Sequence, residues 1–337
     1  MKLYLSFAAA IWLSTLANFA LSQSSADAYR KRMMDSIRDV YRTEAAIRNP
    51  ALRQGTISTD VISGSNMSSY LYGNKLFDGH INQVRTTALF TVPVSSWGKN
   101  SLTASFSVFQ QHIRLTDITP YQSGLPNLEG KSYDKLTVGF TGSYSRIDSL
   151  FGKMVVYTAS ISGLTGRASS IQKLSYLGGL IVMLKQQKDR VVGLGFLINI
   201  DPSIKVPAVP YYTYWRKYKN GLELNVNLPQ QLSVRKELSS KISASFGTYL
   251  SGTVAFFRYD QPNLPRDANY STVDLKTGPG LEVRLAKKIM FGLKAGVLTP
   301  LQNREFELNS SASDYFLRNQ INMTPFVNFS FSILPFL

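Results

Sequence analysis

Two histidines are the residues that first suggest catalytic chemistry in this chain. Asp78-Gly79-His80 could supply the Asp/His pair of a surface protease, and His112 with Ser105 or Ser107 could supply a nucleophile and its base. Neither arrangement has a third supporting residue at a recognisable spacing. We therefore expect both histidines to be structural or solvated, and we expect the protein not to be an enzyme.

Other chemical motifs are also missing from the sequence. The 337 residues include no cysteine, which excludes a disulfide scaffold, Cys-ligated zinc, an iron–sulfur cluster and a thiol nucleophile. There is no GxxxxGK[ST] or HExxH motif, and Gly193-Leu194-Gly195 falls inside a strand pattern rather than before a helix. We expect no catalytic, cofactor-binding or metal-binding residues.

The charged residues are more informative. Lys and Arg number 37 against 21 Asp and Glu, a formal net charge of +16. Seven charges share the polar phase of alternating segments: Arg85, Lys135, Glu223, Arg235, Glu282, Arg284 and Lys294. Basic residues lining a pore lower the cost of passing anions, whereas Lys and Arg in loops can meet lipopolysaccharide phosphates. We expect a mixture of both roles and, because the chain is expected to be exported, no nucleic-acid binding.

Strands must position these charges, because most of the chain alternates apolar and polar residues with period two. The alternation is clear in residues 84–92, 102–108, 135–145, 222–228, 289–297 and 327–333. A soluble sandwich or propeller would bury the apolar phase, whereas a transmembrane barrel would turn it towards lipid and keep a polar lumen.

Three features favour the barrel. The polar phase is rich in Ser, Thr, Gly, Asn and charge, and the segments are long enough to cross a bilayer when tilted. Connections also alternate in length, as in barrels with short periplasmic turns and long external loops. Longer ones lie near 73–80, 117–132, 162–170, 201–207, 261–270 and 299–314; shorter ones lie near 95–100, 148–152, 186–190, 218–220, 238–240 and 286–288. We predict an all-β, antiparallel, up-and-down barrel in the outer membrane.

The strand count depends on one break in the sequence. If Leu228-Pro229-Gln230-Gln231 is a tight external turn, the alternation of short and long connections stays in phase and the barrel has about 14 strands. If residues 221–237 are an irregular excursion, it has about 12. Both numbers are even, and closure removes the unpaired strand edges that a bilayer cannot solvate.

Aromatic residues are placed where a membrane interface would need them. Trp97, Tyr214, Trp215 and Tyr218 fall at or beside turns expected on the periplasmic side. The final segment, residues 329–337, resembles the carboxy-terminal signal of the barrel-insertion machinery, although Pro335 interrupts it and Phe336 is penultimate. The expected partners are that machinery, outer-membrane lipid and lipopolysaccharide, and the oligomeric state is open.

The amino terminus has the features of an export signal. A basic start at Met1-Lys2 precedes an uncharged apolar stretch, and Ala20-Leu21-Ser22 offers a cleavage site before Gln23. An amino-terminal membrane anchor is the alternative. We expect a signal peptide over residues 1–22, a helix and linker over 23–53, and the barrel over 54–337.

Residues 24–48 follow a helical period instead of alternation. Tyr29, Met33, Ile37, Val40 and Ile47 share one face, Ser24 and Ser25 could begin the helix, and Asn49-Pro50 could end it. The amphipathic helix could be solvated in the periplasm, could plug the barrel mouth, or could bind a partner.

The whole pattern resembles an outer-membrane β-barrel of Bacteroidota type. A narrower similarity, to a family of barrels of unknown function from those bacteria, rests on residues 206–214 and 221–229 and on the strand Leu232-Ser233-Val234-Arg235. This resemblance implies an even-stranded barrel and a membrane location, and it offers no activity. Our leading hypothesis is a passive channel for small solutes with a slight anion preference, and the alternative is a closed structural or partner-binding barrel.

Overall fold

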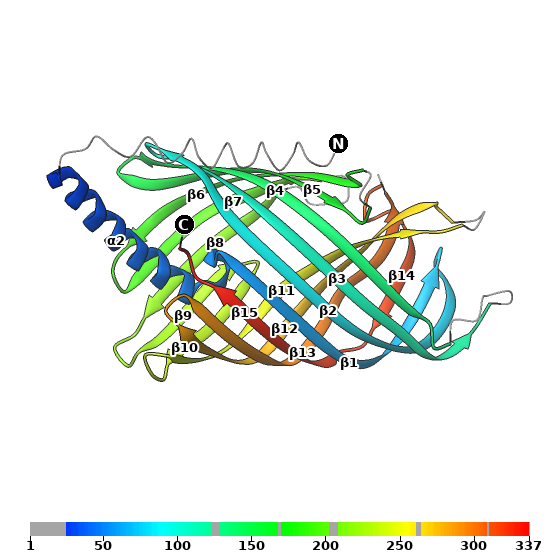
Figure 1. Cartoon of the computed structure of the whole chain (residues 1–337). Coiled ribbons are helices and arrows are strands. Elements are labelled where there is room, and N and C mark those ends of the chain that lie inside the picture. The colour runs from blue at the N-terminus through cyan, green and yellow to red at the C-terminus, as the bar shows by residue number, and fades with distance from the viewer. Residues whose placement is uncertain are drawn as a thin grey trace, which may run out of the picture. The chain divides into compact units, whose positions relative to one another are not determined.

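The computed structural model describes residues 25–122, 129–167, 170–201, 208–260, 264–308 and 310–336. The expected signal peptide, residues 1–22, lies outside them. The described chain comprises a helix, α2 (Ser25–Arg48), a single 3-10 turn, η1 (Pro50–Leu52), and the strands β1 to β15 (Figure 1). The helix and the strands form separate compact units that divide between Leu52 and Arg53. No helix in the described ranges is both long and apolar enough to cross a bilayer.

The strands follow one another around a single sheet. Their bounds are β1 Gly55–Leu71, β2 Asn74–Trp97, β3 Asn100–Pro120, β4 Ser132–Leu150, β5 Lys153–Thr165, β6 Lys173–Gln186, β7 Arg190–Ile200, β8 Ala208–Lys217, β9 Leu222–Leu228, β10 Gln231–Glu237, β11 Ile242–Arg258, β12 Asp267–Ala286, β13 Ile289–Glu307, β14 Tyr315–Ile321 and β15 Thr324–Ile333. Each pairs antiparallel with its sequence neighbour from β1 through to β13.

The sheet closes on itself through the last two segments. β14 and β15 each pair with β13 on one side and with β1 on the other, in the same register, so they are two parts of one strand interrupted at Asn322-Met323. The protein is therefore a closed antiparallel barrel of 14 strands. The predicted fold and the predicted count of 14 are confirmed, and the alternative of 12 is wrong.

The count was decided at residues 222–237, which form a regular hairpin. β9 and β10 pair through six consecutive residues, from Asn227 opposite Gln231 to Leu222 opposite Lys236. Only Pro229 and Gln230 separate the two strands. The alternation of residues 222–228 therefore marked a true strand, and the Pro229 break marked a tight turn.

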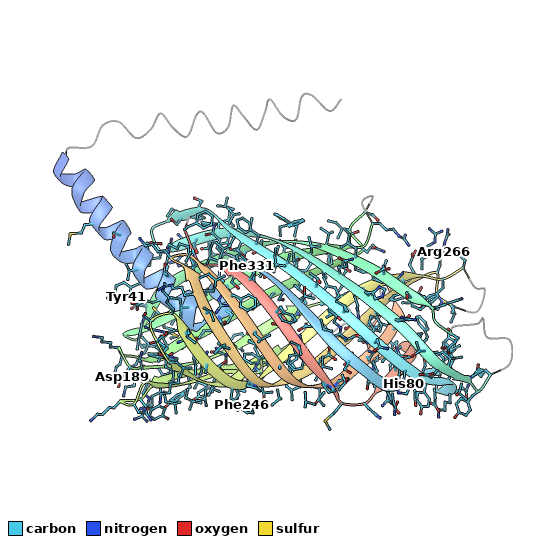
Figure 2. All side chains as sticks on the ribbon, turned by 60° about the horizontal axis from the view of Figure 1, so that its bottom comes forward. Tyr41, His80, Asp189, Phe246, Arg266 and Phe331 are labelled. Carbon is cyan, nitrogen blue, oxygen red and sulfur yellow. The ribbon has the colours of Figure 1, made fainter. Side chains whose placement is uncertain are left out.

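Connections at the two ends of the barrel differ in length, as expected. One end carries the turns 98–99, 151–152, 187–189, 218–221, 238–241 and 287–288, and the other carries longer connections such as 121–131, 201–207, 259–266 and 308–314. Figure 2 shows this polarity, with Asp189 at one end and His80 and Arg266 at the other. The end with short turns also holds the start of β1 and is periplasmic by the usual architecture of outer-membrane barrels.

One predicted loop is wrong. Residues 73–80 are not a long connection, because β1 and β2 are joined by Tyr72 and Gly73 alone. Both residues have positive φ, 48° and 84°, as a two-residue hairpin turn that matches the strand twist requires. The predicted long loop over 299–314 is likewise shorter, since β13 continues to Glu307.

The outer wall of the barrel is apolar. Exposed large apolar side chains occupy the outward phase of nearly every strand, among them Ile57, Val61, Phe90, Phe106, Phe140, Ile161, Phe196, Phe246, Leu281, Val297, Phe329 and Phe331. A soluble protein does not expose a continuous apolar surface of this extent, whereas a lipid-facing belt requires one. The protein is an integral outer-membrane barrel.

The wall is not equally tall all round. β1 to β4 and β11 to β13 have 17 to 24 residues, whereas β8, β9 and β10 have 10, 7 and 7. β4 and β11, which the shorter strands separate in the sheet, come into direct contact, and the Thr137 hydroxyl donates a 3.0 Å hydrogen bond to the Val254 carbonyl. The taller strands thus meet across the barrel towards the external end.

Candidate functional site: the barrel lumen

The inward phase of the strands is fixed by contacts between strands that are not neighbours. Arg85 on β2 bonds to Asp274 on β12, and Thr137 on β4 bonds to β11. Only side chains that point into the lumen can make such contacts. The register carries this phase along the wall, because Arg85 lies opposite Gln111 and Gln111 lies opposite Lys135.

Buried ion pairs cross the middle of the lumen. The Arg85 guanidinium is paired with the Asp274 carboxylate and also donates to Gln83 Oε1 at 2.6 Å. Nearby, the Lys276 ammonium on β12 donates to Asp60 on β1 at 2.6 Å. All four charges therefore have a partner, and the arrangement ties β12 to the first two strands of the barrel.

Two further groups of ion pairs lie nearer the periplasmic end. Glu282 accepts a 2.6 Å hydrogen bond from Arg53, which directly precedes the barrel. Glu223 is almost fully buried, with the Lys217 ammonium at 3.1 Å and the Arg235 guanidinium at 3.6 Å. Four of the seven predicted lumen charges, Arg85, Glu223, Arg235 and Glu282, thus have an opposite charge within 4.0 Å.

The other three predicted charges are basic and lack such a partner. Among the described residues, no carboxylate oxygen lies within 4.0 Å of Lys135, Arg284 or Lys294. The ammonium of Lys294 lies 3.9 Å from the ring centre of Tyr249, and that of Lys135 lies 4.0 Å from the ring centre of Phe257. A pore role for all seven stays a prediction.

Apolar side chains fill the lumen where the tall strands meet. Met67, Ile81, Ile113, Leu115, Ala255 and Tyr270 are buried together, with Leu76 and Phe77 in the same cluster. A smaller cluster joins Ile62, Leu298 and Phe326. These residues come from both sides of the barrel, so this part of the interior is a packed core and not an open space.

The inward face of β3 to β5 is different, because it carries small hydroxyl residues. Ser101 bonds to Ser145 at 2.7 Å, Thr91 to Ser105 at 2.9 Å and Thr141 to Ser162 at 2.8 Å. Leu177 on the neighbouring β6 also points inward, since it lies opposite Ser160, which lies opposite Ser143. An inward leucine that is 37% exposed requires accessible space beside it.

The predicted interface aromatics lie at or near periplasmic turns. Trp97 ends β2, is half-exposed and lies 6.4 Å from the ring of Tyr144. Tyr218 begins the turn after β8, with the Arg216 guanidinium 4.8 Å from its ring centre. Within β8, Tyr214 and Trp215 face opposite sides, and Trp215 lies opposite Asn225 in the inward phase of Glu223. Anchoring in the interface stays a prediction for these aromatics.

The histidines do not form the arrangements that catalysis would need. His80 lies 3.6 Å from Asp117, whereas Asp78 is bonded to Lys75, Ser68 and Tyr121. His112 bonds to Asp134 at 2.8 Å on the outward face, while Ser105 and Ser107 occupy the inward phase of the same strand. The described residues contain no group of three or more His, Asp or Glu side chains that could hold a metal ion.

Four lumen residues were not predicted from the sequence. They complete the ion pairs of the lumen and are Asp60, Asp274, Lys276 and Arg53. A signal for two of them was present, because Asp274 and Lys276 share the even phase of Glu282 and Arg284 in β12. Arg53 precedes the first strand, so no alternation could have identified it.

Comparison with known proteins yields distant structural matches alone. No protein-family model matches the chain, and no curated protein matches its sequence. Similar solved structures include an outer membrane channel from Pseudomonas putida F1, with TM-score 0.35, 10% identity and coverage of 83% of this chain and 96% of that one. The transport unit of the autotransporter AIDA-I from Escherichia coli has a TM-score of 0.32 and 8% identity, and the match covers 84% of this chain and 90% of that one. The Pseudomonas putida toluene transporter TodX has a TM-score of 0.27 and 11% identity, and the match covers 86% of this chain and 92% of that one. Likeness this low assigns neither a family nor a function.

Proposed function

We propose that the protein is a passive outer-membrane channel for small solutes, with a slight preference for anions. The observation that carries the proposal is the polar wall of β3 to β5, beside which the inward Leu177 of β6 is exposed. Ser and Thr can replace water around a passing solute without binding it tightly. The route follows this side of the lumen, because apolar clusters fill the side where the tall strands meet.

The anion preference rests on the unpaired basic residues. Arg85 and Arg235 are each paired with a carboxylate, so they add little net field despite their charge. Arg284 and Lys294 lie towards the periplasmic ends of β12 and β13, and neither has a carboxylate within 4.0 Å among the described residues. Two uncompensated cations in a confined lumen raise the local concentration of anions.

Swelling of proteoliposomes tests the transport itself. Vesicles loaded with a large polysaccharide are diluted into iso-osmotic arabinose, glucose, sucrose or raffinose. A passive channel gives swelling rates that fall steadily with solute size. Equal rates for empty vesicles and protein-containing vesicles would overturn the proposal.

The charge variants test the selectivity. Arg284→Gln and Lys294→Gln together should move the zero-current potential in a salt gradient towards that of an unselective pore. Arg258→Gln, at the external end of β11 and exposed, is the matched control that should leave it unchanged. A double variant as anion-selective as the wild type would refute these two residues as the source of selectivity.

A closed barrel is the second candidate function, and the packed core favours it. The cluster around Met67 and Tyr270 and the contact of β4 with β11 occupy part of the lumen. Such a barrel would support the envelope or bind a partner. It predicts no swelling with any of the sugars.

The remaining sequence-based expectations are part of the same proposal. We infer a cleaved signal peptide over residues 1–22. We also infer membership of a Bacteroidota barrel family, from residues 206–214, 221–229 and 232–235. Lipopolysaccharide and the barrel-insertion machinery are the proposed partners. Amino-terminal sequencing of the mature protein should begin at Gln23.

A further inference from the structure

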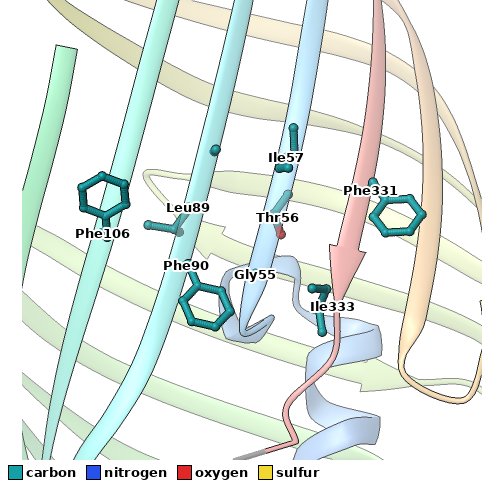
Figure 3. A pocket seen from close by; sticks show the side chains of 9 residues that line it. Gly55, Thr56, Ile57, Leu89, Phe90, Phe106, Phe331 and Ile333 are labelled. Atoms are coloured by element: carbon teal, nitrogen blue, oxygen red, sulfur yellow. The ribbon is translucent and has the colours of Figure 1, made fainter. Parts of the chain in front are cut away.

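A hollow of about 180 Å³ interrupts the outer wall of the barrel at its closing seam (Figure 3). Gly55 and Thr56 on β1 and Ala88 and Leu89 on β2 line it. Its walls are the side chains of Ile57, Phe90, Phe106, Phe331 and Ile333. It therefore spans β15, β1, β2 and β3, where the first and last strands of the barrel meet.

The hollow lies where Gly55 has no side chain and Ala88 has only a methyl group. A Cβ atom at Gly55 would lie 3.0 Å from Cδ2 of Phe90 and 3.8 Å from Cβ of Ile333. The methyl group of Ala88 is small beside the rings of Phe90 and Phe106, which also line the hollow. The only polar side chain in the lining belongs to Thr56, and its hydroxyl lies 3.2 Å from that of Ser332, which is in the inward phase. The hollow thus offers no hydrogen-bonding side chain to an occupant.

The surroundings determine what can fill it. Ile57, Phe90, Phe106 and Phe331 are exposed members of the lipid-facing belt, and Gly55 and Ile333 are the periplasmic ends of their strands. In the membrane this surface meets the acyl chains of the periplasmic leaflet. Because lipid and wall are equally apolar, the hydrophobic effect does not favour one site over another. Dispersion contacts do, and a concave wall of rings surrounds a chain on more sides than a flat belt.

We propose that this hollow is a binding site for one acyl chain of a phospholipid in the periplasmic leaflet. The bound chain contacts β15, β1 and β2 at once and so stabilises the seam that closes the barrel. The site is independent of solute transport, since every wall residue faces lipid.

Native mass spectrometry of the full-length protein in detergent tests the proposal, with palmitoyl-oleoyl phosphatidylethanolamine as the probe. The wild type should retain one lipid at activation energies that strip all others. Ala88→Phe fills the hollow and should lower retention of that lipid about tenfold. Ala244→Phe, which adds the same ring to the outward face of β11, should retain it.

Both variants are first checked for the heat-modifiable gel mobility of a folded barrel. If Ala88→Phe does not fold, Ala88→Leu replaces it as a smaller filling. Equal retention in the wild type, the filled variant and the Ala244→Phe control would overturn the proposal. So would a wild type that carries detergent or a second copy of the chain in preference to the phospholipid.

Discussion

Single residues in this barrel matter most where charge is buried. Arg85 and Asp274 are almost inaccessible to solvent, and they join β2 to β12 across the lumen. Removing one member leaves the other charge buried without a partner, which costs far more than the intact pair contributes. The polar side chains around them, Gln83, Gln111 and Thr272, cannot replace a carboxylate.

Asp274→Asn should therefore destabilise the barrel by about 3–5 kcal/mol. Asp260→Asn is the control, because Asp260 is highly exposed and lies 3.8 Å from Arg258, where the expected effect is below about 1 kcal/mol. Urea titration of the folded barrel in lipid vesicles measures both. Equal midpoints for the two variants would contradict a stabilising role for the central pair.

A second residue-scale prediction concerns Glu129, which lies just before β4 at the external end. Glu129 accepts hydrogen bonds from the backbone N–H groups of Ile118, at 2.7 Å, and Asp117, at 2.9 Å, and these bonds lower the pKa of its carboxyl. Asp117 itself has a positive φ of 54°. Because the pKa of Glu129 is depressed in the folded protein, these two hydrogen bonds stabilise the contact above the ordinary pKa of a glutamate. The stabilisation is lost as the pH falls through the folded-state pKa.

Spin labelling can follow this change, since the native chain has no cysteine. A nitroxide at Lys131→Cys should be less mobile at pH 7 than at pH 3. The added substitution Glu129→Gln should make it equally mobile at both. If the label in the single variant does not respond to pH, the bonds of Glu129 to β3 do not hold residues 129–131 in place.

At the scale of elements, close backbone approach is the strictest local requirement. A Cβ atom at Gly278 on β12 would lie 2.0 Å from the carbonyl oxygen of Ala295 on β13, so a side chain there must push the two strands apart. Gly142 on β4 is a matched control, because its nearest neighbour would be a methyl group of Ile161 at 3.8 Å.

Gly278→Ala should lower the unfolding free energy by about 1–3 kcal/mol, as overpacking in a close contact does. Gly142→Ala should leave it within about 0.5 kcal/mol. Heat-modifiable gel mobility after heating through a temperature series ranks the three proteins. A Gly278→Ala protein as heat-resistant as Gly142→Ala would show that the strands move apart without cost.

Helix α2 keeps the three readings that its sequence allowed. Met33 and Val40, from its predicted apolar face, are 57% and 54% exposed, and the side chains of Tyr29 and Ile37 lie outside those described. Deleting residues 24–49 should leave swelling rates unchanged if the helix is solvated or binds a partner, and a marked rise in those rates would identify a plug.

Alternation predicted the strands well and their ends poorly. Every alternating segment became a strand, because a period of two admits no other regular structure. The sequence predicts a loop over residues 73–80, whereas β2 already begins at Asn74. Polar residues such as Asn74 and Lys75 are ambiguous, because they occur both in loops and where strands leave the membrane. The lumen phase was visible in β12, but the pairing of Asp274 with Arg85 was not, because it joins strands far apart in the sequence.

The whole molecule combines a continuous lipid-facing belt with an uneven interior. Its closure and its belt follow from strand number and alternation, and both were predictable. The contact of β4 with β11 was not, because it depends on the relative heights of strands, which each hairpin's register sets. This contact leaves one side of the lumen packed and the other lined by small polar side chains, and the proposed channel depends on that difference.

Single-channel recording of the wild-type protein in a planar bilayer under a potassium chloride gradient tests the channel most directly. We expect discrete, stable conductance steps and a zero-current potential displaced towards that of chloride. The absence of conductance steps from a protein with the heat-modifiable mobility of a folded barrel would contradict the proposed channel. The protein would then be a closed barrel that supports the envelope or binds a partner.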